Sequence, residues 1–362
     1  MIRLGWLNDT IMSKIKEKHK KIISIIIEKG SMQSSDIYAE MLKLGESISL
    51  VTVKRALSEM TDAGVLTAIG SGRSRRYDIS VLGRIFAEVD PKKYCAIEPD
   101  KRYGMAGYNF NLFSMLPPDI FTEEELRILN DETDKYRRRI NDLSSTIQKK
   151  ELERLIIELS WKSSKIEGNT YTLLDTEKLI LENKEASGHD KKEARMILNH
   201  KDAFNFIHEN RAQFKTLTPK NLEELHTILI KDLSVELGLR KKPVGITGSK
   251  YRPLDNIYQI TEATEALCSA VSKIETPYAK ALIALLGIGY IQPFEDGNKR
   301  TGRLMANGLL LAYDCTPLSY RSIGENDYRE AMLIFYELNA IGPFQKIFID
   351  QYKFAVSNYT VK

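Results

Sequence analysis

The residues best suited to chemistry lie in one short segment, Gln292 to Arg303. An Asp-Gly-Asn turn in this segment is followed by a cluster of cations, Lys299, Arg300 and Arg303. Free backbone N–H groups at the start of a helix, together with the helix dipole, bind phosphate well. Asp296, the first residue of the turn, could hold Mg²⁺ between its carboxylate and phosphate oxygens. The residue types alone therefore predict a site for a Mg²⁺-nucleotide or for another phosphate.

Two helices must position this segment. An apolar run over residues 281–290 precedes it, and a second apolar run over residues 304–311 follows it. The turn then falls where the second helix begins, which brings the free N–H groups and the cations to one place. An ordinary turn before a well-capped helix would explain the Asp, Gly and Asn, but it would not explain the neighbouring cations.

The segment resembles the signature of the Fic family, His-x-Phe-x-Asp/Glu-Gly-Asn-Gly/Lys-Arg-x-x-Arg. The matching residues are Phe294, Asp296, Gly297, Asn298, Lys299, Arg300 and Arg303. The resemblance extends from about Pro117 to the C-terminus, and it implies a helical domain that binds ATP with Mg²⁺ and transfers AMP to a hydroxyl of a target protein. By position, it implies metal binding by Asp296, an anion hole at Gly297, Asn298 and Lys299, phosphate contact by Arg300, and a core anchor at Phe294.

One position departs from the family pattern. The family has a His that takes the proton from the target hydroxyl, whereas this chain has Gln292. An amide has no accessible pKa near neutrality, and the loss of a general base typically lowers the rate by about 10²–10⁴, while electrostatic stabilisation of the phosphates could remain. His200 and His226 stay open as spatial replacements. A natural pseudoenzyme, a diverged activity and an engineered inactive variant all fit the sequence.

A second motif lies upstream, at the end of a helical run over about residues 147–168. Its residues Ser163, Glu167 and Gly168 match the Ser/Thr-x-x-x-Glu-Gly/Asn inhibitory motif of Fic proteins. In that family the glutamate pairs with the second arginine of the signature, here Arg303, and obstructs the γ-phosphate of ATP. Because the planar fork of arginine holds either a carboxylate or a phosphate, the two compete. The resemblance therefore implies autoinhibition within the chain.

The stretch over residues 241–260 is rich in glycine and proline, which predicts a loop or a β-hairpin. It resembles the flap of the family, a hairpin that aligns a target segment by strand addition. The flap residues implied by the resemblance are Thr247, Gly248 and Ser249. A solvent-facing loop between helices is the alternative.

The N-terminal region carries all of the charge excess. Residues 1–80 hold 13 basic and 9 acidic residues, whereas the remaining 282 hold 40 of each.

The same region has the pattern of a winged helix-turn-helix. Helical spacing over 12–29, 34–44 and 50–63 is followed by predicted strands over 65–69 and 75–79. We expect Gly30 to end its first helix, Ser34 or Ser35 to cap the second, and Ser49 to cap the third. The residues expected to face DNA are Thr52, Lys54, Arg55 and Ser58 on the third helix and Arg73, Arg75 and Arg76 on the wing. Such domains also mediate protein contacts.

The composition is that of an ordinary globular protein, with 43% hydrophobic and 28% charged residues and a net charge of +4. It excludes a disordered or collagen-like chain. The three cysteines, Cys95, Cys268 and Cys315, lie far apart, so neither a zinc site nor a disulfide framework is predicted. The longest apolar run has about 11 residues, short of the ~20 that a membrane span needs. We expect a reduced, cytoplasmic protein without a membrane partner.

These observations predict a mainly α protein, with a Fic-type helical domain that carries a β-hairpin flap and with an N-terminal winged-helix domain. The expected boundaries are 1–80 for the winged helix, 81–120 for a connector and 121–362 for the Fic-type domain. The first functional hypothesis is an autoinhibited protein adenylyltransferase that uses ATP and Mg²⁺ on an unknown target protein, with its activity reduced or absent because of Gln292. The alternative is a non-catalytic, nucleotide-sensing regulator that binds DNA or protein, and transfer of another phosphate-linked group is a third possibility. A homo-oligomer is also possible, since Fic proteins are often regulated through self-association.

Overall fold

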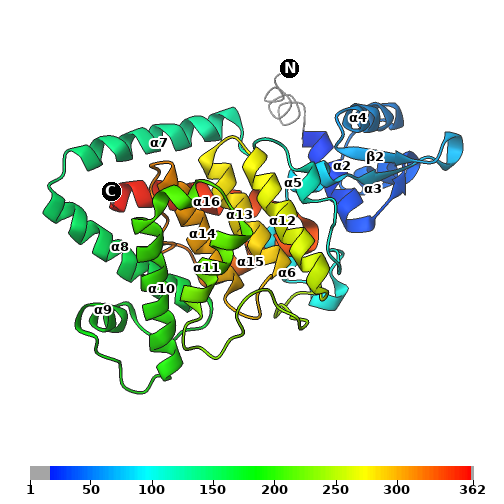
Figure 1. Cartoon of the computed structure of the whole chain (residues 1–362). Coiled ribbons are helices and arrows are strands. Elements are labelled where there is room, and N and C mark those ends of the chain that lie inside the picture. Colours follow the sequence, from blue (N-terminus) through cyan, green and yellow to red (C-terminus); the bar gives the residue numbers. More distant parts are fainter. Residues whose placement is uncertain (1–16, 360–362) are drawn as a thin grey trace. The chain divides into compact units, whose positions relative to one another are not determined.

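The computed structural model describes residues 17–359 of the chain. As expected, the protein is mainly helical (Figure 1). The chain divides into two compact units, and each unit is built from three separate stretches of sequence. The first unit contains Met1–Thr122, Gly245–Arg252 and Glu330–Gln345. The second unit contains Glu123–Val244, Pro253–Arg329 and Lys346–Lys362. Among the described residues, no helix is both long enough and apolar enough to cross a membrane.

The first unit begins with the expected order of helices and hairpin. Its helices and strands are α2 (Glu17–Lys29), β1 (Met32–Gln33), α3 (Ser34–Lys43), α4 (Leu50–Asp62), β2 (Leu66–Ile69) and β3 (Arg76–Ile79). The strands form an antiparallel sheet in the order β1-β3-β2. The expected inner face of α4 is buried, with Val53 and Leu57 at 0% exposure, so the periodicity prediction for this helix is confirmed.

Local signals at the helix ends explain most of these boundaries. Gly30 follows α2 with φ +79°, a conformation that favours glycine. The Ser49 hydroxyl accepts the Thr52 N–H at 3.2 Å, so the predicted cap of α4 is confirmed. The predicted serine cap of α3 is wrong: Gln33 is the N-cap, and its side chain makes no capping bond. Gln33 is instead drawn into β1, which pairs with β3. Residues 12–16 of the first expected helix lie outside the described residues.

The rest of the first unit consists of short elements and of segments from later in the chain. The short elements are α5 (Val81–Ile85), α6 (Pro91–Cys95), η1 (Gly72–Ser74), η2 (Pro99–Lys101) and η3 (Phe113–Met115). Residues 330–345 add the C-terminal part of α15 (Glu325–Leu338) and the first turn of α16 (Gly342–Asn358). The residues expected to form a connector therefore pack in the same unit as the winged helix.

The second unit is a helical assembly around a central pair. Besides parts of α15 and α16, its helices are α7 (Glu123–Asn141), α8 (Ser145–Ile166), α9 (Leu173–Glu182), α10 (Lys191–Glu209), η4 (Arg211–Lys215), α11 (Pro219–Leu229), α12 (Ile257–Lys273) and the central pair α13 (Pro277–Ile291) and α14 (Asn298–Ala312). α13 and α14 are the two predicted helices around the chemical segment, and both are buried along nearly their whole length. They approach closely because Gly302 has no side chain: a Cβ there would lie 3.0 Å from the Leu285 carbonyl oxygen.

The segment expected to form a β-hairpin flap contains no strand, so this part of the fold prediction is wrong. From residue 241 to 256 the chain is a loop with a turn closed by Ser249 N–H and the Ile246 carbonyl at 3.1 Å. The Arg240 guanidinium donates to the carbonyls of Lys242 and Leu254, one on each arm of the loop. An arginine therefore bridges the arms where a strand ladder would otherwise pair them.

Candidate phosphate-binding site

The chemical segment is a rigid turn between α13 and α14. Gln292 ends α13 in the left-handed region, with φ +51°, and Gly297 precedes α14 with φ +79°. Phe294 is fully buried, and its ring stacks on that of His226 with centroids 3.6 Å apart and planes 6° apart. The His226 Nε2–H donates to the Asp296 carbonyl at 2.9 Å. His226 thus fixes the turn from α11.

The start of α14 keeps its backbone donors available. No side chain caps the helix at Gly297, and the first backbone bond runs from the Thr301 N–H to the Gly297 carbonyl at 2.8 Å. Helix geometry therefore leaves the N–H groups of Asn298, Lys299 and Arg300 without intrahelical acceptors. Donors at this end of a helix favour an anion because the dipole adds to them.

Arg300 supplies buried donors at the same place. Its side chain is 1% exposed, and Nη2 donates to Asp296 Oδ2 at 2.9 Å. Its Nε and Nη1 have no hydrogen-bond partner within residues 17–359. Burial lowers the pKa of this guanidinium, although Asp296 and Glu167 oppose that effect. A buried donor left unpaired costs about 1–3 kcal/mol, so these nitrogens indicate a site for an acceptor such as phosphate.

Arg303 lies one turn along α14, and its side chain is fully buried. Its Nη2 donates to Glu167 Oε1 at 2.9 Å and to the Ser163 carbonyl at 2.8 Å, and its Nε donates to Ser163 Oγ at 2.9 Å. Lys299 Nζ donates to the other Glu167 oxygen at 3.3 Å. The structure thus brings the two sequence motifs into contact, and Glu167 forms ion pairs with two cations of the segment, Arg303 and Lys299.

Glu167 stays charged in this position. Burial by itself raises the pKa of its carboxyl, but the positive charges of Arg303 and Lys299 outweigh burial and hold that pKa below its usual value. Glu167 is also the C-cap residue of α8, and Gly168 follows with φ +98°, which favours glycine. The inhibitory role of Ser163, Glu167 and Gly168 itself stays a prediction.

Gln292 is a structural part of the turn. The residue is 8% exposed. Its Nε2 donates to the Gly289 carbonyl at 2.7 Å, and its Oε1 accepts from Asn298 Nδ2 at 2.9 Å. The Asn298 side chain also bridges the Phe294 N–H and carbonyl, both at 2.8 Å. Both polar atoms of the Gln292 amide are therefore used to brace the turn, together with Asn298.

The two histidines left open as replacement bases are both fully buried. Burial lowers the pKa of His226 to about 4, although its bond to the Asp296 carbonyl opposes the shift. Burial also lowers the pKa of His200 well below its usual value, and the charges of Arg303 and Arg300 add to this effect. Both imidazoles are therefore neutral at pH 7 and shielded from a target hydroxyl in this conformation.

Asp296 is the residue suited to a metal ion. Its side chain is 62% exposed beside Arg300. Among the described residues, no group of three or more His, Cys, Asp or Glu side chains could hold a metal ion. Magnesium fits a single carboxylate, because it commonly takes its remaining ligands from substrate phosphates and water. The donor set thus suits Mg²⁺ bound together with a phosphate ligand and does not suit a metal cage made by the protein alone.

The expected DNA-facing residues lie on the surface of the first unit, and Thr52 and the cations Lys54, Arg55, Arg73, Arg75 and Arg76 are all exposed or half-buried. Several of them also have partners within the protein. Arg55 pairs with Glu59 at 3.0 Å, Arg75 lies 5.5 Å from the Tyr77 ring centroid, and Arg76 donates to the Ser31 carbonyl.

The expected flap residues also belong to the first unit. Thr247 is exposed, the Gly248 carbonyl accepts from Arg102 at 2.8 Å, and Ser249 Oγ donates to Glu337 at 2.7 Å. Sequence reasoning missed Arg102 and Glu337, and it also missed the role of His226, because each acts through a partner far along the chain.

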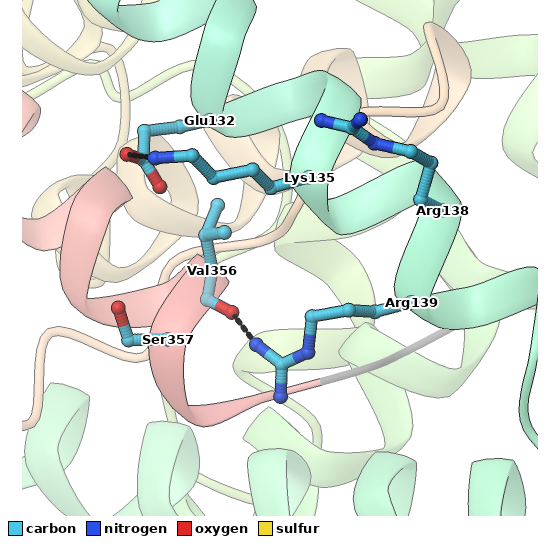
Figure 2. A pocket seen from close by; sticks show the side chains of 6 residues that line it. All are labelled: Glu132, Lys135, Arg138, Arg139, Val356 and Ser357. Atoms are coloured by element: carbon cyan, nitrogen blue, oxygen red, sulfur yellow. Dashed lines mark hydrogen bonds and ion pairs between the residues drawn. The ribbon is translucent and has the colours of Figure 1, made fainter.

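A different surface hollow, of about 410 Å³, lies between α7 and α16 (Figure 2). Its lining residues are Glu132, Lys135, Arg138, Arg139, Val356 and Ser357. Figure 2 shows Lys135 paired with Glu132 and Arg139 bound to the Val356 carbonyl. Lys135 and Arg139 therefore already have acceptors within the protein, unlike Nε and Nη1 of Arg300.

The fold and the segment together define a class, a helical domain with a cation-rich turn at the start of a buried helix. Residues 216–310 match the profile of the Fic/DOC family, and residues 12–86 match that of the Ferric uptake regulator family. The chain therefore contains a Fic/DOC family domain, preceded by a helix-turn-helix domain like that of the Ferric uptake regulator family.

Curated relatives are named "Protein adenylyltransferase Fic". The one from Nematostella vectensis is 27% identical over 175 residues, which is 47% of this chain and 41% of the relative. The one from Drosophila willistoni is 30% identical over 156 residues, 42% of this chain and 31% of the relative. The chain thus spans less than half the length of these relatives.

Solved structures support the fold. Fic-1 from C. elegans is similar with a TM-score of 0.56 and 18% identity, covering 65% of this chain and 72% of that one. A Fic domain containing signaling protein from Bacteroides thetaiotaomicron is similar with a TM-score of 0.54 and 20% identity, covering 64% of this chain and 94% of that one. At these identities, the similarity establishes the helical fold.

Proposed function

We propose that this protein binds Mg-ATP at the start of α14 and is a Fic-type protein adenylyltransferase, held inhibited by Glu167. The observation that carries the proposal is the pair of unpartnered donors on buried Arg300, beside the free N–H groups of the helix start. Phosphate oxygens would satisfy all of these donors. The names of the relatives support the same activity.

Each residue of the segment has a role in this proposal. The N–H groups of Asn298 and Lys299 bind phosphate oxygens, and Gly297 leaves room for their approach. Arg300 and Arg303 donate to the phosphates, and Asp296 holds Mg²⁺, which when bound neutralises phosphate charge. Phe294 and His226 keep the turn rigid, so the donors need no reorganisation when the ligand binds.

In the transfer step, the oxygen of a target hydroxyl forms a bond to the α-phosphorus, and the bond from that phosphorus to the bridging oxygen breaks. Pyrophosphate leaves, and the hydroxyl proton must go to a base. Gln292 has no accessible pKa and both of its amide atoms are bonded within the turn, so the proton passes to solvent. We therefore expect this step to be slow, by about 10²–10⁴ relative to a chain with a histidine there.

In this proposal, inhibition follows because Glu167 already binds the cations that a phosphate needs. The Glu167 carboxylate takes the Arg303 fork and the Lys299 ammonium, which a terminal phosphate would otherwise bind. A carboxylate and a phosphate cannot share these donors, so ATP must displace Glu167.

A labelled-ATP assay tests the function. We expect Q292H combined with E167G to label itself or a target protein, at a rate about 10²–10⁴ above that of E167G alone. Equal labelling by both variants would show that the missing base does not limit the reaction. No labelling by the double variant, with ATP bound, would contradict the transferase activity.

A second candidate function is a nucleotide-sensing regulator without catalysis, in which the winged helix binds DNA or a protein. The observation that favours it is the engagement of both Gln292 amide atoms in the turn, which makes this residue a brace. Retention of ATP binding together with no labelling by any of these variants would support this alternative. Under either function, a cytoplasmic location and a protein or DNA partner stay proposals.

A further inference from the structure

A second buried charged cluster lies in the first unit, centred on Glu337 of α15. The Glu337 side chain is fully buried. Its Oε2 accepts from the Tyr94 hydroxyl at 2.7 Å. Its Oε1 accepts from Arg102 Nη1 at 3.2 Å, from Ser249 Oγ at 2.7 Å and from the Lys250 N–H at 3.3 Å. A buried carboxylate with several donors is well compensated, and two of these donors belong to the expected flap loop.

The partner cation binds the same loop. Arg102 Nη1 also donates to the Gly248 carbonyl at 2.8 Å, while Nε and Nη2 donate to the carbonyls of Ile97 and Cys95 at 2.9 and 3.1 Å. In return, Lys250 Nζ donates to the Arg102 carbonyl at 2.6 Å. The ion pair therefore fixes the backbone of residues 248–250 from both sides.

The remainder of the loop divides into a fixed and an open part. The Arg252 N–H donates to the Ala106 carbonyl at 2.8 Å, and the Tyr251 ring stacks on Tyr336 with centroids 6.0 Å apart. By contrast, Gly245 and Thr247 are exposed, and neither makes a backbone–backbone hydrogen bond with any residue in the described range. Residues 248–252 thus fix the base of the loop, whereas the backbone groups of Gly245 and Thr247 stay open to pairing with an extended peptide, as strand addition requires.

The same turn of α15 also packs into the winged helix. Ile334 and Leu338, which flank Glu337 on α15, belong to the buried hydrophobic cluster of the N-terminal module, and so does Tyr94. That cluster includes Leu57 of α4 and Tyr77 of β3, and Ile334, Leu338 and Leu57 are at 0% exposure. A single helical turn therefore contacts the winged-helix core and, through Glu337, the loop.

We propose that Glu337 is a positioning residue that presets the loop for an extended peptide of a target protein and couples it to the winged-helix core. The coupling means that a change in packing of the N-terminal core alters the order of the loop. The target-docking part rests on the proposed function, whereas the positioning and the coupling do not.

Hydrogen exchange of the full-length protein, followed by mass spectrometry, tests the positioning. We expect E337Q to speed exchange of the amides of residues 248–252 by about tenfold or more, because the neutral amide weakens bonds made to a charged group. The matched control is E330Q, on the same helix but without a bond to the loop. Unchanged exchange of residues 248–252 in E337Q would overturn the proposal, as would equal acceleration in E330Q.

A milder variant keeps the test valid if E337Q does not fold. S249A removes one bond between the loop and Glu337 and leaves the Arg102 pair in place. We expect about a threefold to tenfold acceleration over residues 248–252 and none over residues 22–26 of α2. No acceleration in the loop would contradict the role of Glu337.

The coupling has its own test. V53A shortens a fully buried side chain of α4 in the winged-helix cluster. We expect several-fold faster exchange both in α4 and in residues 248–252, because the smaller side chain weakens the packing of the cluster. Acceleration confined to α4 would overturn the coupling. ATP affinity should be equal in wild type and E337Q, so a failure to bind ATP rejects the proposed function and leaves the exchange results intact.

Discussion

Two buried arginines, Arg300 in the second unit and Arg102 in the first, differ in what their guanidinium groups bind. Arg102 donates from Nε, Nη1 and Nη2 to fixed carbonyls and to Glu337. Arg300 donates from Nη2 alone, and its Nε and Nη1 have no partner in the described structure. A buried hydrogen-bond donor that has no acceptor destabilises the folded protein. Arg102 thus has acceptors within the fold for all of these nitrogens, whereas our proposal assigns the unpartnered nitrogens of Arg300 to a ligand.

The largest expected effect separates these arginines by stability. R102M removes the positive charge that pairs with the buried Glu337 carboxylate, so we expect the free energy of unfolding to fall by about 3–5 kcal/mol. R300M leaves only the exposed Asp296 carboxylate unpaired, and we expect a change within about 1 kcal/mol. Urea denaturation followed by circular dichroism measures both. Equal losses in the two variants would remove the distinction between them.

The second prediction concerns pH and the turn beside Arg300. The pKa of His226 is lowered from 6.5 to about 4 in the folded protein, chiefly by burial. The unfolded chain therefore takes up a proton at a higher pH than the folded one, and the stability that the neutral imidazole contributes is full above pH 6.5 and is lost as the pH falls toward 4. The expected loss is about 3 kcal/mol.

The control for this prediction is H226Q, which cannot titrate in this range. We expect its free energy of unfolding to fall less steeply between pH 6.5 and 4 than that of the wild type, in denaturation curves at matched salt. Other groups, including His200, titrate in both proteins and cancel in the difference. Parallel pH profiles would show that His226 does not hold the turn as a buried neutral ring.

The third prediction concerns the ion pairs of Glu167 with Arg303 and Lys299. E167G frees Arg303 and Lys299, so we expect Mg-ATP affinity to rise by about 10- to 100-fold, the value of one charged hydrogen-bond pair. Calorimetric titration measures the change. E153Q, which neutralises another carboxylate of α8, is the control and should bind as the wild type does. An unchanged affinity in E167G would mean that Glu167 does not compete with the phosphates.

The smallest effect is expected on the surface of the winged helix. If this module binds duplex DNA through phosphates, R73Q should weaken binding modestly and lower the slope of log K against log salt by about one. Arg73 is exposed at the tip of the wing. Gel retardation across a salt series measures the slope. An unchanged slope would place Arg73 outside the DNA contact, and no retardation of the wild type at low salt would favour a protein partner.

The sequence was informative where the determinants are local. The helices α13 and α14, the turn between them and the Ser49 cap depend on neighbouring residues, and each was predicted. The missed features depend on distant partners. His226 meets Phe294 from a different helix, and Glu337 meets Arg102 across more than half the chain. No spacing rule reports such pairs.

The wrong predictions have the same cause. The hairpin expected within residues 241–260 forms no strand: residues 241–256 are a loop, and residues 257–260 begin α12. The Arg240 guanidinium donates to carbonyls on both arms of the loop, a role that glycine and proline content does not reveal. The cap of α3 is wrong because Gln33 pairs with Arg76 in the sheet, far along the chain. In both regions a long-range bond outweighs the local preference.

The central claim is that the unpartnered donors of Arg300 are a phosphate site. Calorimetric titration of Mg-ATP into E167G and into E167G combined with R300M tests it most directly, because Glu167 is absent from both. We expect tight binding to E167G and a loss of about 10- to 100-fold or more in the combined variant, with unfolding curves that stay similar. Equal affinity in the two proteins would contradict the account, since the buried guanidinium would then serve no ligand.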